Sequence, residues 1–303
     1  MGAMESVRRP WTAEAAAPLV AAAADRWGLR GTPELLRLGT NASHRVGDAV
    51  VRVAPAGRDR EAVERELHLA RFLAARGFDA VRPLDVAAPI EVEGHWATAW
   101  AWIPHDPAGV TEGEAFGALI RGFHEVTEDY DAPLPGWGGL ELIAARLAGL
   151  RRNPHFSGDE LKTLEGVRRG LEERLEELSS STPVGVVHGD AHPGNVLTEE
   201  GTGRSVLADF DLIGGGPRAW DLAPAALHPR RYGADPAWWH AVRRGYGREE
   251  DASWAVCLRV RELASAAWLF AAEDAGAPTR SAEADVRMRA FTGEPDPPVW
   301  GRH

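Results

Sequence analysis

Three oxygen-bearing side chains lie in two short loops of this sequence, at a spacing that suits magnesium and proton chemistry. Asp190 and Asn195 follow an apolar run at residues 184–187, and Asp209 follows a second apolar run at 206–208. Such runs, joined by turn-rich segments, predict short strands and a hairpin with Asp190 and Asn195 in its entering loop and Asp209 at its exit. The oxygens of Asn195 and Asp209 suit Mg²⁺, a hard cation that leaves most of its positions to phosphate and water. Asp190 would then accept a proton from an attacking hydroxyl group.

The first of these loops resembles a known family motif. Residues 188–195 match the pattern H-x-D-x-x-x-x-N of the aminoglycoside phosphotransferase and choline kinase superfamily, which is related to protein kinases, and His188 is its first residue. The resemblance implies an enzyme that transfers the γ-phosphate of ATP, or of GTP, to a hydroxyl of a small molecule. It also implies Asp190 as the catalytic base and Mg²⁺ held by Asn195 and Asp209.

Two further aspartates are expected to support this site. Asp221 matches a family aspartate that hydrogen-bonds the catalytic loop, although it could also be an acidic residue in the first turn of a helix. Asp211 stands where protein kinases have glycine, and it is either a second metal ligand or a structural acid. Residues 214–216 are all glycine, and they are expected to form a turn that leads into a helix.

The resemblance further implies a bilobal α+β fold of the protein-kinase type. We expect a small N-terminal lobe at residues 5–103, with an antiparallel sheet and one key helix, and a larger, mainly helical lobe at 104–303. An alternating pattern of aromatic and small residues at 95–103 predicts a half-buried strand. The family places its hinge at the exit of this strand, so backbone groups of Trp102 and Ile103 are expected to hold adenine.

A first hairpin in the small lobe is expected to cover the nucleotide phosphates. Residues 36–55 have strand–turn–strand character, and the small residues between Gly39 and Ser43, with Asn41 at the centre, would let backbone N–H groups approach phosphate. A plain hairpin without a ligand is the alternative.

Arg52 occupies the position where the family usually has a lysine that contacts the inner phosphates of ATP. Arginine keeps the charge but presents a planar fork, so the role is retained with a different geometry. Glu66 falls on the apolar face of the helix predicted at 59–75, where a carboxylate needs a partner. Arg52 is the expected partner. The alternatives are a solvent-facing Arg52 and a Glu66 at the edge of the core.

Composition and charge restrict the function classes. The 303 residues carry a net charge of −11, which argues against nucleic acid or an anionic membrane surface as partner and is compatible with a cationic acceptor. The single cysteine, Cys257, allows no intrachain disulfide and fits a cytoplasmic protein. We expect a monomer or a homodimer. The only lysine, Lys162, is not part of a G-x-x-x-x-G-K-[ST] loop, which excludes P-loop kinases.

The predicted function is therefore an ATP-dependent O-phosphotransferase with Mg²⁺, acting on an aminoglycoside-type or other antibiotic. A metabolic kinase for choline, homoserine or a sugar is the alternative. Two other classes remain: a Zn²⁺ hydrolase that uses His188, Asp190, His192 and Asp209, and an inactive relative that only binds. The hydrolase leaves Asn195, Arg52 and Glu66 without a role.

Overall fold

The computed structural model describes residues 11–85, 88–107, 109–178, 181–247, 251–294 and 299–301. Contacts within the chain divide it into two compact units. The first unit comprises Met1–Pro107 together with Glu199–Asp211, and the second comprises Ala108–Thr198 together with Leu212–His303.

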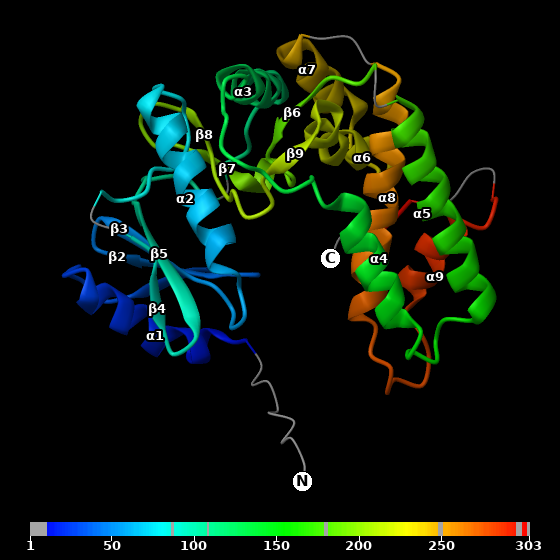
Figure 1. The fold of residues 1–303 in the computed structure, drawn as a ribbon, viewed down its shortest axis with the longest axis horizontal. Helices are drawn as coiled ribbons and strands as arrows, with labels where there is room; N and C mark the ends of the chain where they lie inside the picture. The colour runs from blue at the N-terminus through cyan, green and yellow to red at the C-terminus, as the bar shows by residue number, and fades with distance from the viewer. Residues whose placement is uncertain are drawn as a thin grey trace. The chain divides into compact units, whose positions relative to one another are not determined.

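The first unit contains a five-stranded antiparallel sheet with the strand order β1-β2-β3-β5-β4 (Figure 1). Its strands are β1 (Glu34–Leu38), β2 (Ala42–Val46), β3 (Ala49–Val53), β4 (Ile90–Val92) and β5 (His95–Ala101). Successive side chains of a strand point to opposite faces of the sheet. In β3, Val51 and Val53 therefore enter the core, while Arg52 between them points to the other face.

Helices cover the two faces of this sheet, with α1 (Ala13–Arg26) on the face of Val51 and α2 (Arg60–Ala75) on the face of Arg52. Each begins at a side chain that satisfies a backbone N–H of the first turn. Thr12 accepts from the Ala15 N–H at 3.2 Å, and Asp59 accepts from the Glu61 N–H at 3.2 Å. Such caps replace bonds that the first turn of a helix cannot make internally.

Residues 199–211 belong to the first unit because β8 (Ser205–Leu207) is attached to the segment after α2. The Leu207 N–H donates to the Asp79 carbonyl at 2.9 Å, and the Leu207 carbonyl accepts from the Val81 N–H at 2.9 Å. These two bonds hold the end of β8, and the chain continues directly into Asp209 and Asp211.

The second unit is mainly helical and is built around α8 (Ser253–Ala272). Residues on several sides of α8 are buried, among them Cys257, Val260, Leu263 and Phe270, because other helices pack against it. Its neighbours are α4 (Gly139–Leu150), α5 (Gly158–Leu178), α6 (Ala223–Arg231) and α9 (Ala282–Arg289). A second group consists of α3 (Gly113–Val126) and α7 (Pro236–Tyr246), which pack on each other.

Short elements of the second unit carry the loop at residues 188–195 and the segment that contains Asp221. They are β6 (Val184–Val187), η1 (Pro193–Asn195), β7 (Val196–Thr198), β9 (Gly214–Pro217) and η2 (Arg218–Leu222). Strands β6 and β9 pair antiparallel, with Val187 opposite Gly214. The loop at residues 188–195 therefore starts at the end of β6, and pairing with β9 fixes the position of this strand.

The expectation of a turn at residues 214–216 is wrong, because these glycines form β9. The segment 135–137 runs along this strand: the Gly215 N–H donates to the Pro135 carbonyl at 2.8 Å, and the Trp137 N–H donates to the Gly215 carbonyl at 3.1 Å. A Cβ atom on Gly214 would lie 2.8 Å from the Trp137 Cα, and one on Gly216 would lie 2.7 Å from the Trp137 Cβ. Glycine is thus required here for close approach, although it is a poor strand former in general.

In the part of the chain that the structure describes, no helix combines the length and apolar character needed to cross a membrane.

Candidate active site

The loop after β6 is held by the buried carboxylate of Asp221, which comes from η2. Asp221 accepts from the His188 N–H at 2.7 Å and from the Gly189 N–H at 2.9 Å. His124 of α3 lies 3.0 Å from the same carboxylate through Nε2. Because hydrogen bonds to an ionised group are stronger than neutral ones, these contacts fix the backbone immediately before Asp190.

Gly189 cannot be exchanged for another residue without disturbing this loop. Its φ is 89°, in the region that favours glycine, and a Cβ atom there would lie 2.0 Å from the Leu212 carbonyl oxygen. The Gly189 carbonyl accepts from the Trp220 indole N–H at 2.9 Å. The backbone before Asp190 is therefore fixed both by the conformation of Gly189 and by the hydrogen bond that its carbonyl accepts.

A guanidinium and an imidazole flank the Asp190 carboxylate, which is partly exposed. Arg261 of α8 approaches Asp190 Oδ1 with Nη2 at 2.8 Å, and His192 Nε2 lies 3.5 Å from Oδ2. Burial alone raises the pKa of Asp190, but the hydrogen bond with His192 and the charge of Arg261 outweigh it and hold the pKa well below its ordinary value. Asp190 is therefore a carboxylate at neutral pH.

Asn195 closes the same loop from its other end. Its side-chain Nδ2 donates to the Asp190 backbone carbonyl at 3.0 Å, and the residue itself is buried. This bond sets the orientation of the Asn195 amide. Asn195 belongs to the second unit and Asp209 to the first.

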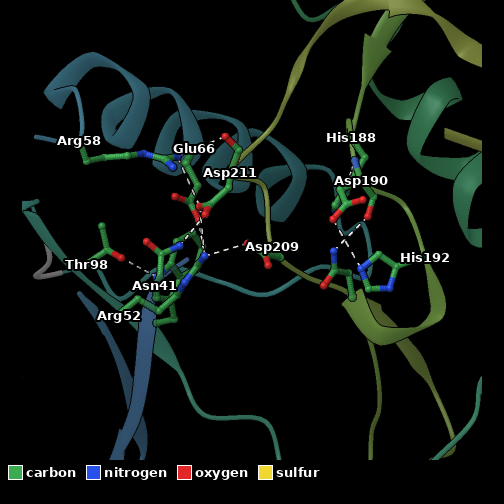
Figure 2. A network of polar contacts seen from close by, with 12 residues as sticks. Asn41, Arg52, Arg58, Glu66, Thr98, His188, Asp190, His192, Asp209 and Asp211 are labelled. Carbon is green, nitrogen blue, oxygen red and sulfur yellow. Dashed lines mark hydrogen bonds and ion pairs between the residues drawn. The ribbon is translucent and has the colours of Figure 1, made fainter. Parts of the chain in front are cut away.

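A cluster of charges in the first unit surrounds Arg52 (Figure 2). The expected ion pair between Arg52 and Glu66 is present and joins Nη1 to Oε1. The other terminal nitrogen of Arg52 contacts Asp209 at 2.8 Å and Asp211 at 3.1 Å. Arg58 adds a second guanidinium, 3.5 Å from the Asp211 carboxylate. Arg52 is thus the common partner of all three carboxylates.

This cluster holds one more carboxylate than guanidinium, and the pKa values follow from that imbalance. Burial raises the pKa of Glu66 above its ordinary value. The charge of Arg52 lowers this pKa, but repulsion from Asp211 and Asp209 raises it further. Burial alone would lower the pKa of Arg52, but the carboxylates around it raise it instead. Asp211 is also buried, yet Arg52 and Arg58 lower its pKa overall.

Asp209 itself has an unusual backbone. Its φ is 69°, a left-handed conformation that few residues other than glycine adopt and that aspartate tolerates better than most. Strain of this kind persists only where the surroundings hold it, which is common at functional sites. Here the contact with Arg52 holds the side chain, of which 32% remains exposed.

The residues expected to cover the phosphates lie in the turn between β1 and β2 and in the first part of β2. The Asn41 side chain donates to the Asp211 carboxylate, and the Gly39 N–H donates to the Asn41 carbonyl at 3.0 Å. Ser43 is the cross-strand partner of Arg52, so the two side chains share a face of the sheet. The turn is thereby tied to the charged cluster, and its contact with phosphate remains a prediction.

Trp102 and Ile103 follow β5 at the expected hinge. The Trp102 N–H donates to the Asp48 carbonyl at 3.0 Å, and the Ile103 carbonyl lies 2.8 Å from His105 Nδ1. Both of these backbone groups therefore have partners within the first unit. The prediction of an adenine contact rests on the other backbone groups of this segment.

Arg58 and Arg261 were not identified from the sequence. Arg58 lies between β3 and α2, where no periodic pattern marks it, and 153 residues separate it from Asp211. Arg261 lies 71 residues from Asp190. The only sequence signal for Arg261 is that it belongs to a short charged group with Arg259 and Glu262 inside an otherwise apolar helix.

The described residues do not contain a group of three or more His, Cys, Asp or Glu side chains arranged to hold a metal ion. Mg²⁺ does not need such a group, because it binds through one or two protein oxygens and completes its shell with phosphate and water.

Comparison with known proteins agrees with this description. A family model described as the phosphotransferase enzyme family matches residues 9–258. A search of curated protein sequences gives no match. Solved structures show the same fold at low sequence identity, among them choline kinase LicA from Streptococcus pneumoniae, with a TM-score of 0.65 and 14% identity over 90% of this chain and 96% of that chain.

Two other solved structures are comparably similar. The aminoglycoside phosphotransferase APH(3'')-Id from Streptomyces rimosus has a TM-score of 0.62 and 18% identity, over 84% of this chain and 99% of that chain. A microcompartment-associated aminopropanol kinase has a TM-score of 0.63 and 18% identity, over 90% of this chain and 94% of that chain. The predicted α+β fold of the protein-kinase type is confirmed by this likeness.

Proposed function

Because the chain belongs to the phosphotransferase enzyme family, we propose that it transfers the γ-phosphate of ATP to a hydroxyl group of a small molecule. The observation that carries this proposal is the loop at residues 188–195. Asp221 holds its backbone, and the loop presents Asp190 as an ionised carboxylate. An ionised, positioned carboxylate is the group that phosphoryl transfer to an alcohol requires on the acceptor side.

Asp190 would orient the acceptor hydroxyl and take up its proton. Its lowered pKa makes it a weak base, so the proton would move late, when the bond to phosphorus has begun to form. A loose transition state needs little help from a strong base, because positioning supplies most of the rate. Arg261 and His192 would keep Asp190 charged while the hydroxyl binds.

The donor set also fits Mg²⁺, which would be held by Asp209 and Asn195 through hard oxygen atoms. The Asp209 carboxylate supports this assignment, because 32% of its side chain remains exposed beside Arg52. Bound Mg²⁺ would neutralise charge on the phosphates. Arg52 would clamp the inner phosphates, and Glu66 would position Arg52. Asp211 would act as a structural acid, because its carboxylate pairs with Arg52 and Arg58 and accepts a hydrogen bond from Asn41.

Similar structures include kinases of antibiotics and of metabolic alcohols. An aminoglycoside phosphotransferase crystallised with streptomycin and a spectinomycin phosphotransferase stand beside choline and aminopropanol kinases. The sequence favours an antibiotic as the acceptor and a metabolic alcohol as the alternative. We keep the broader class, a hydroxylated small molecule, because both groups share this fold.

The test is ATP consumption with Mg²⁺ across a panel of hydroxylated antibiotics and metabolites, with the phosphorylated product identified by mass. Asp190→Asn should lower kcat by about 10²–10⁴-fold, the usual contribution of a positioned proton acceptor, while ATP binding changes little. Asp159→Asn is the matched control, since this aspartate is 93% exposed on α5. An Asp190→Asn variant that turns over within a few-fold of the wild type would refute the assignment.

A further inference from the structure

A pocket of about 320 Å³ lies in the second unit beside the catalytic-type loop. This volume is at the lower end of the range of about 300–1,000 Å³ for small-molecule sites. Its walls come from the loop after β6, from α6, α8 and α9, and from the segment after α6. Four of the lining side chains supply apolar surface: Pro224, Leu227, Tyr232 and Trp268.

The pocket reaches the Asp190 carboxylate through two of its lining residues. Arg261 lines the pocket and contacts Asp190 at 2.8 Å, and His192 lines the pocket and lies 3.5 Å from Asp190. A molecule in the pocket would therefore contact side chains that themselves contact the group that would receive the hydroxyl proton. This location makes the pocket the natural place for the acceptor.

The charged side chains that line the pocket are arginines. Arg261 and Arg287 contribute guanidiniums, and His192 and His228 add imidazole groups. Among the described residues that line it there is no aspartate and no glutamate. An ammonium group in this pocket would find positive charge and no free carboxylate.

The nearby carboxylates are already occupied by arginines of the protein. Asp190 is paired with Arg261, as described above. Glu283 is 2.8 Å from Arg287 and also accepts the Gly301 N–H at 2.9 Å. Glu262 is fully buried against Arg230, Arg231 and Arg259.

Arg146 is a further guanidinium near Asp190, beyond those that the carboxylates pair with. Arg146 of α4 donates to the Ala264 carbonyl at 3.3 Å and has no carboxylate within ion-pair distance in the described residues. Burial and repulsion from Arg261 lower the pKa of Arg146, while Asp190 opposes this change. The surroundings of Asp190 therefore hold more positive than negative charge.

We propose that the acceptor is a hydroxylated small molecule that carries an oxyanion, either carboxylate or phosphate, and that the cationic lining of this pocket rejects acceptors with ammonium groups. The inference rests on the proposed function, and it replaces the cationic acceptor that the overall charge made plausible. Oxyanions match the planar donors of arginine. The aromatic faces of Tyr232 and Trp268, the latter 52% exposed, suit the apolar side of a ring on the same molecule.

The test compares three ligands with one pyranose ring and different charges: glucuronate, glucose and glucosamine. Binding is followed without nucleotide by NMR signals of His192 and His228, assigned with single His→Asn variants, at a pH where glucosamine is fully protonated. Glucuronate should bind about tenfold more tightly than glucosamine, the ratio that one favourable charge contact of about 1.4 kcal/mol gives. Equal or tighter binding of glucosamine overturns the proposal, and so does a glucuronate titration that leaves both histidines unchanged.

Arg261→Gln tests the effect of the lining charge on ligand choice with little effect on folding. Arg261 is 23% exposed, whereas Arg287 is nearly buried, so a change at Arg287 would disturb the fold more. The variant should bring the binding ratio of glucuronate to glucosamine close to one. Arg174→Gln, on the exposed face of α5, is the matched control and should leave the ratio unchanged. A ratio in Arg261→Gln that equals the wild-type ratio overturns the role of the lining charge.

The same three ligands are then offered as acceptors with Mg·ATP, together with phosphorylated and carboxylated alcohols. The proposal expects kcat/KM for anionic acceptors to exceed that for their amino counterparts by about tenfold, again one charge contact. Faster phosphorylation of the amino compounds overturns it. If the binding order holds but no alcohol is phosphorylated, the proposed function fails while the charge preference of the pocket stands.

Discussion

The two partners of the ion pair between Arg52 and Glu66 should not be equally important for stability. Glu66 is 5% exposed and Arg52 is 13% exposed, so removal of either partner leaves a charge out of water. Arg52→Ala leaves Glu66, Asp209 and Asp211 with Arg58 as their remaining guanidinium, whereas Glu66→Ala leaves Arg52 with two carboxylates. Arg52→Ala should therefore be the more damaging change.

The expected magnitude follows from this difference. Breaking a buried pair so that a charge is left uncompensated costs about 3–5 kcal/mol, and we expect Arg52→Ala to fall in this range. Glu66→Ala should cost about 1–2 kcal/mol, since the buried guanidinium keeps strong hydrogen-bond acceptors. The double variant should be less destabilised than the sum of the two by about 2 kcal/mol, because contacting residues are not additive.

The assay is native-state hydrogen exchange at amides of β3 and α2, which reports the first unit even if the two units unfold separately. The steady-state KM for ATP is measured on the same variants, and Arg52→Lys should recover part of the loss. The control cycle uses Arg60 and Glu64, an exposed pair on the same helix, where coupling should be below about 0.5 kcal/mol. Additive losses at Arg52 and Glu66, or equal single losses, would refute the reasoning.

Three further predictions concern the second unit. Glu262→Gln should lower the free energy of unfolding in urea by about 3–5 kcal/mol. Because the surrounding arginines lower the pKa of Glu262, the wild type should lose this stability as the pH falls below 4.5, and the variant should not. Cys257 should resist thiol reagents at pH 8 unless the protein is unfolded, since burial raises its pKa to about 12; rapid native labelling would contradict this. Gly189→Ala should lower the unfolding free energy by about 2 kcal/mol or more, whereas Gly149→Ala, in an open helical position, should not.

The local part of the fold could be predicted from the sequence because its signals lie within one element. The capping residues Thr12 and Asp59 and the periodic apolar faces mark the starts and lengths of α1 and α2. The same periodicity put Glu66 on the buried face of α2, from which the ion pair with Arg52 followed. In each case the physical constraint acts over three or four residues.

Strand β9 could not be predicted because its constraint acts between distant segments. Glycine has no side chain to produce an alternating pattern, and its strand propensity is low. The need for glycine arises from Trp137, which lies directly against Gly214 and Gly216. A tertiary contact thus overrides a local preference that favours a turn.

Arg261 shows the same limit at the candidate site. Its partner Asp190 is recognised by a motif, but the motif contains no information about which helix packs beside the loop. Charged residues in an apolar helix indicate that a polar partner exists somewhere in the fold. They do not identify it, because α8 also carries Arg259 and Glu262, which satisfy each other.

The charge of the acceptor illustrates why an overall property predicts a site poorly. The net charge of −11 made a cationic acceptor reasonable, but much of the negative charge lies on exposed helices such as α5, whose glutamates face water. Charges separated by more than about 10 Å of water are largely screened at ordinary salt, so they act little on a bound ligand. Buried or half-buried groups at the pocket, such as Arg261 and Arg287, are screened far less. Selectivity should therefore follow the local lining, and raising the salt concentration should weaken the preference for glucuronate without reversing it.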